Sequence, residues 1–175
     1  MTMNSLIQYL ATPKHPIETG NPASWPNIEA HLGLTLPEDY KEFINNYGTV
    51  VIAEFLIVLN PFSERVQFSL FDKGQAILRI LSKIQKSGDD TLNVFSLYPG
   101  SGGLLPWGFT DFGHNLCWLT NGNPDKWSSI ILEPRSLKHE IVETSMASLI
   151  LSIAKKSAIS KILPRTRGKV FAEVL

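Results

Sequence analysis

The stretch Leu32-Gly33-Leu34-Thr35-Leu36-Pro37-Glu38-Asp39-Tyr40-Lys41-Glu42-Phe43-Ile44-Asn45-Asn46-Tyr47-Gly48 decides the fold of this 175-residue chain. It predicts one helix that ends at Gly33 and a second helix that Pro37 opens, since proline at the first helical position loses no hydrogen bond. Apolar side chains recur at helical spacing along the second helix and should form one buried stripe. The stripe consists of Leu36, Tyr40, Phe43, Ile44 and Tyr47. Gly48 then provides a left-handed stop.

The composition fits one compact domain, with 43% hydrophobic residues. Lys plus Arg and Asp plus Glu both number 16, so the net charge favours no class of partner. The charge is unevenly spread, because residues 155–175 carry a net +5 and residues 1–154 the balancing −5. We predict a domain over residues 1–157 and a basic C-terminal tail over residues 158–175, either solvated or docked on its own domain. The acidic body would suit a cationic partner.

Cysteine usage and hydropathy indicate a cytoplasmic protein. The single cysteine, Cys117, excludes an internal disulfide and a multi-cysteine metal site, and its alternating apolar context predicts burial. The first ten residues lack a basic region followed by a long apolar stretch, so no secretory signal is evident. The most apolar run, residues 50–59, is interrupted by Glu54 and is too short to cross a membrane. We therefore expect no membrane contact.

The rest of the chain reads as strands followed by a final helix, which indicates an α+β layer architecture. We expect strands at residues 49–59, 94–98, 104–110, 115–120, 129–132 and 140–142. Residues 104–120 should form a hairpin with Gly113 in its turn. A helix capped by Asp72 should bury Ala76, Ile77, Ile80, Leu81 and Ile84. Thr144 or Ser145 should cap a last helix that buries Leu149, Ile150 and Ile153.

Residues with catalytic potential do not assemble into a convincing site. The glycine-rich segment 100–103 is followed by Pro106 rather than by a helix, so it is better explained as a loop than as a phosphate-binding turn. Asp111 and His114 could form an acid–base pair, but they need a nucleophile or a metal, and we expect His114 in a solvated turn. The four histidines show no paired ligand spacing. We predict no enzyme activity, no metal and no cofactor.

Aromatic residues crowd around the predicted hairpin. We expect Trp107 and Trp118 in the core, and Phe112 and Trp127, which lie in predicted turns, at the surface. Tryptophan and tyrosine often anchor protein–protein contacts, because each buries a large area for few fixed torsions. Lys and Arg are not interleaved with these aromatics on the same strands, so direct nucleic-acid binding is not favoured.

Three segments, in order, resemble the SUKH superfamily, which includes many bacterial immunity proteins and a fungal regulator of cell-wall synthesis. The first joins Leu32-Gly33 to Leu36-Pro37-Glu38-Asp39-Tyr40-Lys41 and Tyr47-Gly48. The second comprises Leu104-Leu105-Pro106-Trp107-Gly108, Gly113 and Leu116-Cys117-Trp118-Leu119. The third joins Ile130-Ile131-Leu132 to Ser148-Leu149-Ile150. One departure is Gly113-His114, where members often have Gly-Asp.

The resemblance implies an α+β fold with a central, mainly antiparallel sheet covered by helices, and binding rather than catalysis. It implies an immunity protein of a polymorphic toxin system, which neutralises a cognate toxin domain, often a nuclease, by direct contact. The alternative is an intracellular scaffold or regulator that binds a cellular protein, as the fungal relatives do. A small hydrolase using His114 is a more distant alternative.

A toxin-binding surface should combine negative charge, which steers a basic partner, with aromatic anchors. Acidic residues in predicted turns and helix starts, with aromatic neighbours, meet this description. The candidate partner-binding residues are Glu38, Asp39, Asp111, Phe112, Asp125 and Trp127.

Overall fold

The computed structural model describes residues 2–87, 92–166 and 168–175. The described helices are α1 (Thr2–Tyr9), α2 (Trp25–Leu32), α3 (Glu38–Tyr47), α4 (Asp72–Lys86), α5 (Met146–Ala154) and the short 3-10 helix η1 (Pro124–Lys126). The described strands are β1 (Val50–Ile52), β2 (Leu56–Val58), β3 (Leu104–Thr110), β4 (Asn115–Leu119), β5 (Ser129–Glu133), β6 (Lys138–Val142) and β7 (Ala172–Val174). These strands form one antiparallel sheet in the order β6-β5-β4-β3-β2-β1-β7, which confirms the predicted α+β class.

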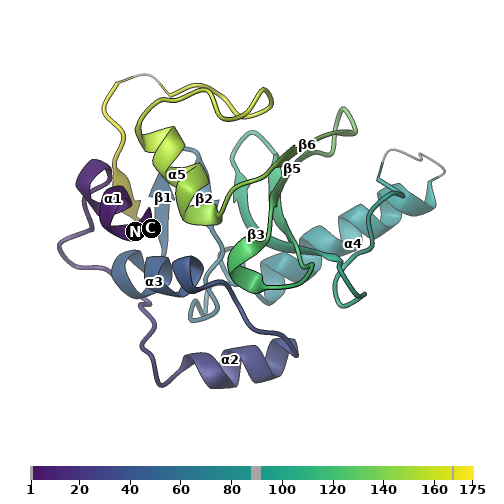
Figure 1. Cartoon of the computed structure of the whole chain (residues 1–175), viewed down its shortest axis with the longest axis horizontal. Helices are drawn as coiled ribbons and strands as arrows, with labels where there is room; N and C mark the ends of the chain where they lie inside the picture. The colour runs from purple at the N-terminus through teal and green to yellow at the C-terminus, as the bar shows by residue number, and fades with distance from the viewer. Residues whose placement is uncertain (1, 88–91, 167) are drawn as a thin grey trace.

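Helices cover both faces of the sheet. In Figure 1, α3 and α5 lie in front of the strands with α1 beside them, while α4 lies behind. Successive residues of β6 identify the two faces, because adjacent strand side chains point in opposite directions. The Glu140 carboxylate accepts a hydrogen bond from Ser160, which follows α5. The His139 ring instead contacts Phe95, whose carbonyl oxygen accepts from Gln85 of α4.

The predicted stripe along α3 lies at the centre of the core. All five of its residues are buried, with relative exposures of 0 or 1%. Two of them are tyrosines whose hydroxyls donate to backbone carbonyls: Tyr40 to Leu59 at 2.6 Å, and Tyr47 to Leu10. These bonds satisfy the only polar atom of each side chain, so the rings can be buried without the cost of an unpaired hydroxyl. Burial raises the pKa of Tyr47 to about 12.

Gly48 ends α3 for a steric reason. Its φ is +62°, and a Cβ at this position would lie 1.9 Å from the carbonyl oxygen of Ile17. That oxygen accepts a hydrogen bond from the backbone N–H of Thr49, so the close approach belongs to a regular contact between the N-terminal segment and β1. Only glycine fits both the conformation and the space.

The structure corrects the single strand predicted over residues 49–59. The segment forms the two short strands β1 and β2, which are joined by a tight turn. Ala53 and Glu54 adopt left-handed φ values of +53° and +67°, and the Phe55 N–H donates to the Ile52 carbonyl. Such turns usually contain Asn and Gly, so the apolar run carried no turn signal.

The predicted strand over residues 94–98 is also wrong. The segment forms turns, with only an isolated bridge between Leu97 and Leu104. The Gln85 side chain of α4 donates to the carbonyls of Leu92 and Phe95, so this backbone is bound to a helix rather than to a strand. Val94, expected to be a strand residue, is 72% exposed.

The remaining helix predictions hold with small changes. The Asp72 cap predicted for α4 is wrong, because Asp72 is the first helical residue and Phe71 takes the cap position without a side-chain hydrogen bond. Ile80 of this helix is 50% exposed rather than buried. Ser145 caps α5 by accepting a hydrogen bond from the Ser148 N–H, as predicted, and the three predicted apolar residues of α5 are buried. The β3–β4 hairpin and its Gly113 turn are confirmed.

The basic C-terminal segment returns to the sheet. The Glu140 carboxylate accepts from the Ser160 hydroxyl at 2.6 Å and from the Lys161 N–H at 2.9 Å, while β7 pairs with β1. The boundary predicted between residues 157 and 158 stays a prediction, and Arg167 lies outside the described residues.

We expect Phe43→Ala to lower the free energy of unfolding by about 3–5 kcal/mol, because a fully buried ring leaves a cavity. Phe43 is 0% exposed and stacks on Tyr47 with ring centroids 4.5 Å apart. The measurement is urea denaturation at 25 °C. Ile80→Ala on the exposed side of α4 is the control, and it should change stability by less than about 1 kcal/mol. Equal effects of the two variants would contradict this placement of α3.

Candidate functional site

The predicted binding residues fall into two groups at opposite ends of the β3–β4 hairpin. Asp111 and Phe112 lie in the turn that joins the two strands. Glu38, Asp125 and Trp127 lie near the far ends of the same strands, because η1 follows β4 and contacts the start of α3. Asp39 follows Glu38 in α3 and belongs to this second group. Strands of this length separate the two ends by about 20 Å, at roughly 3.3 Å per residue. The structure therefore does not bring the six residues into one patch.

Two of the predicted acidic residues cap helices. The Asp125 carboxylate accepts from the Glu38 N–H at 2.8 Å, and the Asp39 carboxylate accepts from the Ala147 N–H at 2.9 Å. The first N–H groups of a helix have no partner within the helix and carry partial positive charge, which explains why both carboxylates bind there. Asp125 thus holds the start of α3, and Asp39, from α3, holds the start of α5.

Glu38 remains accessible but is part of an ion-pair network. Its side chain is 65% exposed and lies 2.9 Å from the Lys41 ammonium, which is also 3.3 Å from Glu29. Burial alone would lower the pKa of Lys41. The hydrogen bond to Glu38 and the attraction of both carboxylates outweigh this effect and raise the pKa.

Trp127 is buried, contrary to the expectation of exposure. It is 5% exposed, and its ring lies 6.0 Å from that of Trp118, which contacts Tyr40 at 5.0 Å. The prediction failed because η1 folds back against α3, a contact between residues 87 positions apart that no local pattern reveals. The predicted core positions of Trp107 and Trp118 are confirmed.

The β3–β4 turn presents an aromatic ring to solvent. Phe112 is 59% exposed, and its ring lies 6.0 Å from that of Phe55 in the neighbouring β1–β2 turn. The Asp111 N–H donates to the Phe55 carbonyl at 3.1 Å, so the two turns support each other. This pairing places the exposed Asp111 and Phe112 side chains on a braced rather than an isolated loop.

His114 has a structural environment. It is 7% exposed rather than solvated, and its Nδ1 lies 2.8 Å from the Thr110 hydroxyl oxygen, which also accepts from the His114 N–H at 3.2 Å. The Thr110 hydroxyl has one donor and two acceptor sites, so it can complete this hydrogen bond with either tautomer of the neutral ring. Burial lowers the pKa of His114, and the nearby Glu133 opposes the shift only in part. Its ring is therefore oriented by Thr110 rather than by Asp111.

Cys117 is buried, and burial raises the pKa of its thiol well above the usual range. A thiol that stays protonated is a poor nucleophile. Within the described residues, no group of three or more His, Cys, Asp or Glu side chains could hold a metal ion. Across the same residues, no helix is both long and apolar enough to cross a membrane.

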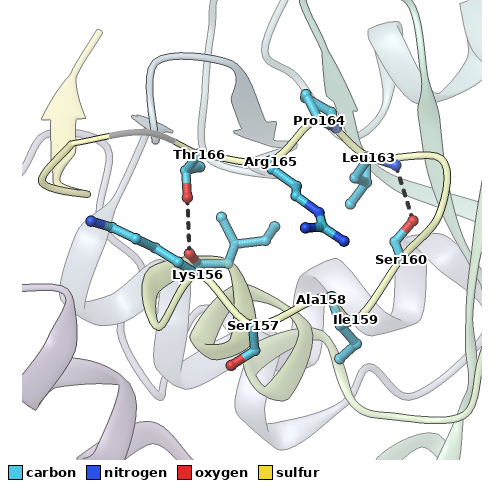
Figure 2. A pocket seen from close by; sticks show the side chains of 10 residues that line it. Lys156, Ser157, Ala158, Ile159, Ser160, Leu163, Pro164, Arg165 and Thr166 are labelled. Carbon is cyan, nitrogen blue, oxygen red and sulfur yellow. Dashed lines mark hydrogen bonds between the residues drawn. The ribbon is translucent and has the colours of Figure 1, made fainter.

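A small hollow lies within the basic loop that follows α5 (Figure 2). The loop is closed by hydrogen bonds from Thr166 to the Ile153 carbonyl and from the Leu163 N–H to the Ser160 hydroxyl, and the Arg165 guanidinium points into it. Its volume of about 30 Å³ is close to the share of one water molecule in the liquid. The hollow is too small for a substrate.

The comparison with protein families decides the relationship. The family SUKH_6, described as "SMI1-KNR4 cell-wall", matches residues 23–150. The chain belongs to the SUKH superfamily. The match covers α2 through the first part of α5. It includes the whole β3–β4 hairpin and the two capping carboxylates, Asp125 at the start of α3 and Asp39 at the start of α5. Searches of curated proteins and of solved structures gave no match.

We expect the free energy of unfolding of this SUKH protein to decrease as the pH is lowered, because of the titration of His114. Because its pKa is lower in the folded state than the unfolded value of 6.5, the unfolded chain binds the proton more readily. The contribution is complete above about pH 6.5 and is lost as pH falls through the folded pKa. Urea denaturation between pH 7.5 and 5 should show a shallower decline for His114→Gln than for the wild type. Parallel curves would contradict this. The pKa of Glu18 is also lowered, but its contribution to stability is lost only below its unfolded value of 4.5, outside the pH range of this experiment.

Proposed function

We propose that this SUKH protein is a non-catalytic immunity protein, which neutralises a cognate toxin domain, often a nuclease in this superfamily, by direct binding in the cytoplasm. The observation that carries the proposal is the turn of the β3–β4 hairpin, where the exposed Phe112 ring stands beside the exposed Asp111 carboxylate. An inhibitor of this kind needs a preformed surface and no reactive group. The braced pair of turns meets that requirement, since it can bind without being reordered.

The charge distribution supports a basic partner. Residues 1–154 carry a net −5, and toxin nucleases are commonly basic because they bind phosphate. Opposite charge raises the association rate through the long-range field. We propose that the contact surface is drawn from Glu38, Asp39, Asp111, Phe112, Asp125 and Trp127. Asp111 and Phe112 have exposed side chains that cap no helix and, unlike Glu38, do not belong to the Lys41 ion-pair network, so they test the contact most directly.

The description of the family favours a second candidate, a scaffold or regulator of a cellular protein, because it refers to the cell wall. The gene next to the one encoding this protein separates the two. A neighbouring gene for a long secreted protein with a variable C-terminal domain supports immunity. An isolated gene supports the regulatory alternative.

We expect the wild-type protein to protect cells that express the neighbouring toxin domain, and His114→Gln to protect equally well. The reason is that His114 is buried against Thr110 and serves the turn rather than a reaction. Growth is measured together with the dissociation constant and the melting temperature of each variant. Protection lost with unchanged affinity and fold would overturn the non-catalytic assignment.

We expect Asp111→Lys to slow association with the toxin domain by about tenfold, because charge reversal at an exposed site weakens steering. Phe112→Ala should instead speed dissociation, since truncating an anchor removes desolvated contact area. Stopped-flow kinetics and surface plasmon resonance measure both rates. Glu64→Lys, an exposed site with the same charge change, and Val94→Ala, with another exposed apolar side chain, are the matched controls. If Asp111→Lys and Phe112→Ala have the same association and dissociation rates as their controls, the contact lies elsewhere.

Variants at Asp125 and Trp127 are less direct tests. Asp125 caps α3 and Trp127 is buried, so their substitution also lowers stability. Their rates are interpretable only beside an unfolding measurement.

A further inference from the structure

We propose that an apolar pocket between α2 and α4 binds a single uncharged aromatic side chain of the protein partner. The inference rests on the proposed function and adds to it a second contact, distinct from the β3–β4 turn. The pocket is half-enclosed and has a volume of about 160 Å³. Its walls come from the end of α2, the first turns of α4 and the start of β3.

The pocket is lined mainly by aliphatic and aromatic carbon. The apolar lining consists of Leu32, Leu70, Phe71, Leu78 and Leu105. Among the described lining residues none is Lys, Arg, Asp or Glu. Tyr98 also contributes, but its hydroxyl already donates to the Leu32 carbonyl, which leaves its ring as the contact surface. His31 and Gln75 are the other lining residues with polar side chains, and neither carries a formal charge that could pair with a charged group stripped of its hydration here.

Gly74 in the first turn of α4 keeps the pocket open. It is buried, yet a Cβ built on it meets no heavy atom within 4 Å, and its φ is not left-handed. Gly48 provides the contrast, because a backbone oxygen only 1.9 Å from the Cβ position requires glycine there. Neither conformation nor packing requires glycine at residue 74, and glycine destabilises a helix relative to alanine. What the missing side chain provides is space.

The size of that space suits a single ring. An enclosed cavity of about 150 Å³ lined by Leu, Ile and Phe side chains binds benzene. A pocket of 160 Å³ therefore accommodates one six-membered ring. His31 and Phe71 at the pocket already meet edge to face, with ring centroids 4.8 Å apart, so a further ring could join an aromatic cluster. Pockets that receive one aromatic side chain are typical hot spots of protein interfaces.

The first experiment measures the pocket without a partner. Benzene is titrated into the methyl-labelled protein, and the resonances of Leu78 and Leu105 are followed by NMR, with Leu149 of α5 as the remote control. We expect saturable shifts at millimolar benzene for the two pocket leucines and none for Leu149. Shifts that do not saturate, or that are equal at all three residues, would overturn the proposal.

Substitution of Gly74 provides the second readout. Gly74→Leu should fill the pocket and abolish the benzene-dependent shifts. Gly74→Ala, which adds one methyl group, should weaken benzene binding at least threefold and raise the melting temperature by about 2–4 °C. Arg79→Leu, which adds a leucine to an exposed position of the same helix outside the pocket, should leave benzene binding unchanged. If Gly74→Leu does not fold, Gly74→Ala decides, and benzene binding at wild-type strength in it would overturn the proposal.

The third experiment links the pocket to the partner. With the toxin domain encoded by the neighbouring gene, Gly74→Leu should weaken binding by about a hundredfold, whereas Arg79→Leu should not. Equal affinities of these two variants would overturn this inference and leave the proposed immunity function standing. A wild-type protein that binds benzene but not the toxin domain would refute the immunity function. It would also refute the assignment of the occupant to that partner.

Discussion

The start of α3 is the point on which the other elements depend. Its first N–H group is held by Asp125 from η1, and one residue later its own Asp39 holds the start of α5. Each bond satisfies an N–H group at a helix start that has no partner within its own helix. The two tyrosines of the buried stripe then fix α3 to Leu59 after β2 and to Leu10 after α1. One ten-residue helix therefore sets the positions of α1, α5, η1 and the sheet.

This arrangement explains why acidic residues in one short sequence motif have different roles. Glu38 and Asp39 are neighbours in the first turn of α3, where negative charge is favourable. Helical geometry turns successive side chains by about 100°, so Asp39 faces α5 while Glu38 points to solvent and pairs with Lys41. Asp39 thus contributes to the architecture, and Glu38 remains accessible to a partner.

The extent to which the sequence predicted the fold depends on the range of the interactions. Periodicity correctly placed the α3 stripe, the β3–β4 hairpin and α5, because each is determined by neighbours a few residues away. Trp127 and His114 were expected at the surface because they lie in turns, but contacts with Trp118 and Thr110 bury them. The Ala53–Glu54 turn was missed, since neither residue favours a left-handed backbone. The pocket beside Gly74 has no sequence signal, as a helical glycine does not show what surrounds it.

The pairing of β7 with β1 has a consequence for the order of assembly. Residues 172–174 cover the outer edge of β1, a strand that lies about 120 residues earlier in the chain. Until those residues have been synthesised, the backbone groups along that edge are open to pairing with another chain. The covering strand is only three residues long, and Glu173 on it is exposed, a charge that discourages a further strand from adding. The last strand to join the sheet therefore also protects the molecule against aggregation along that edge.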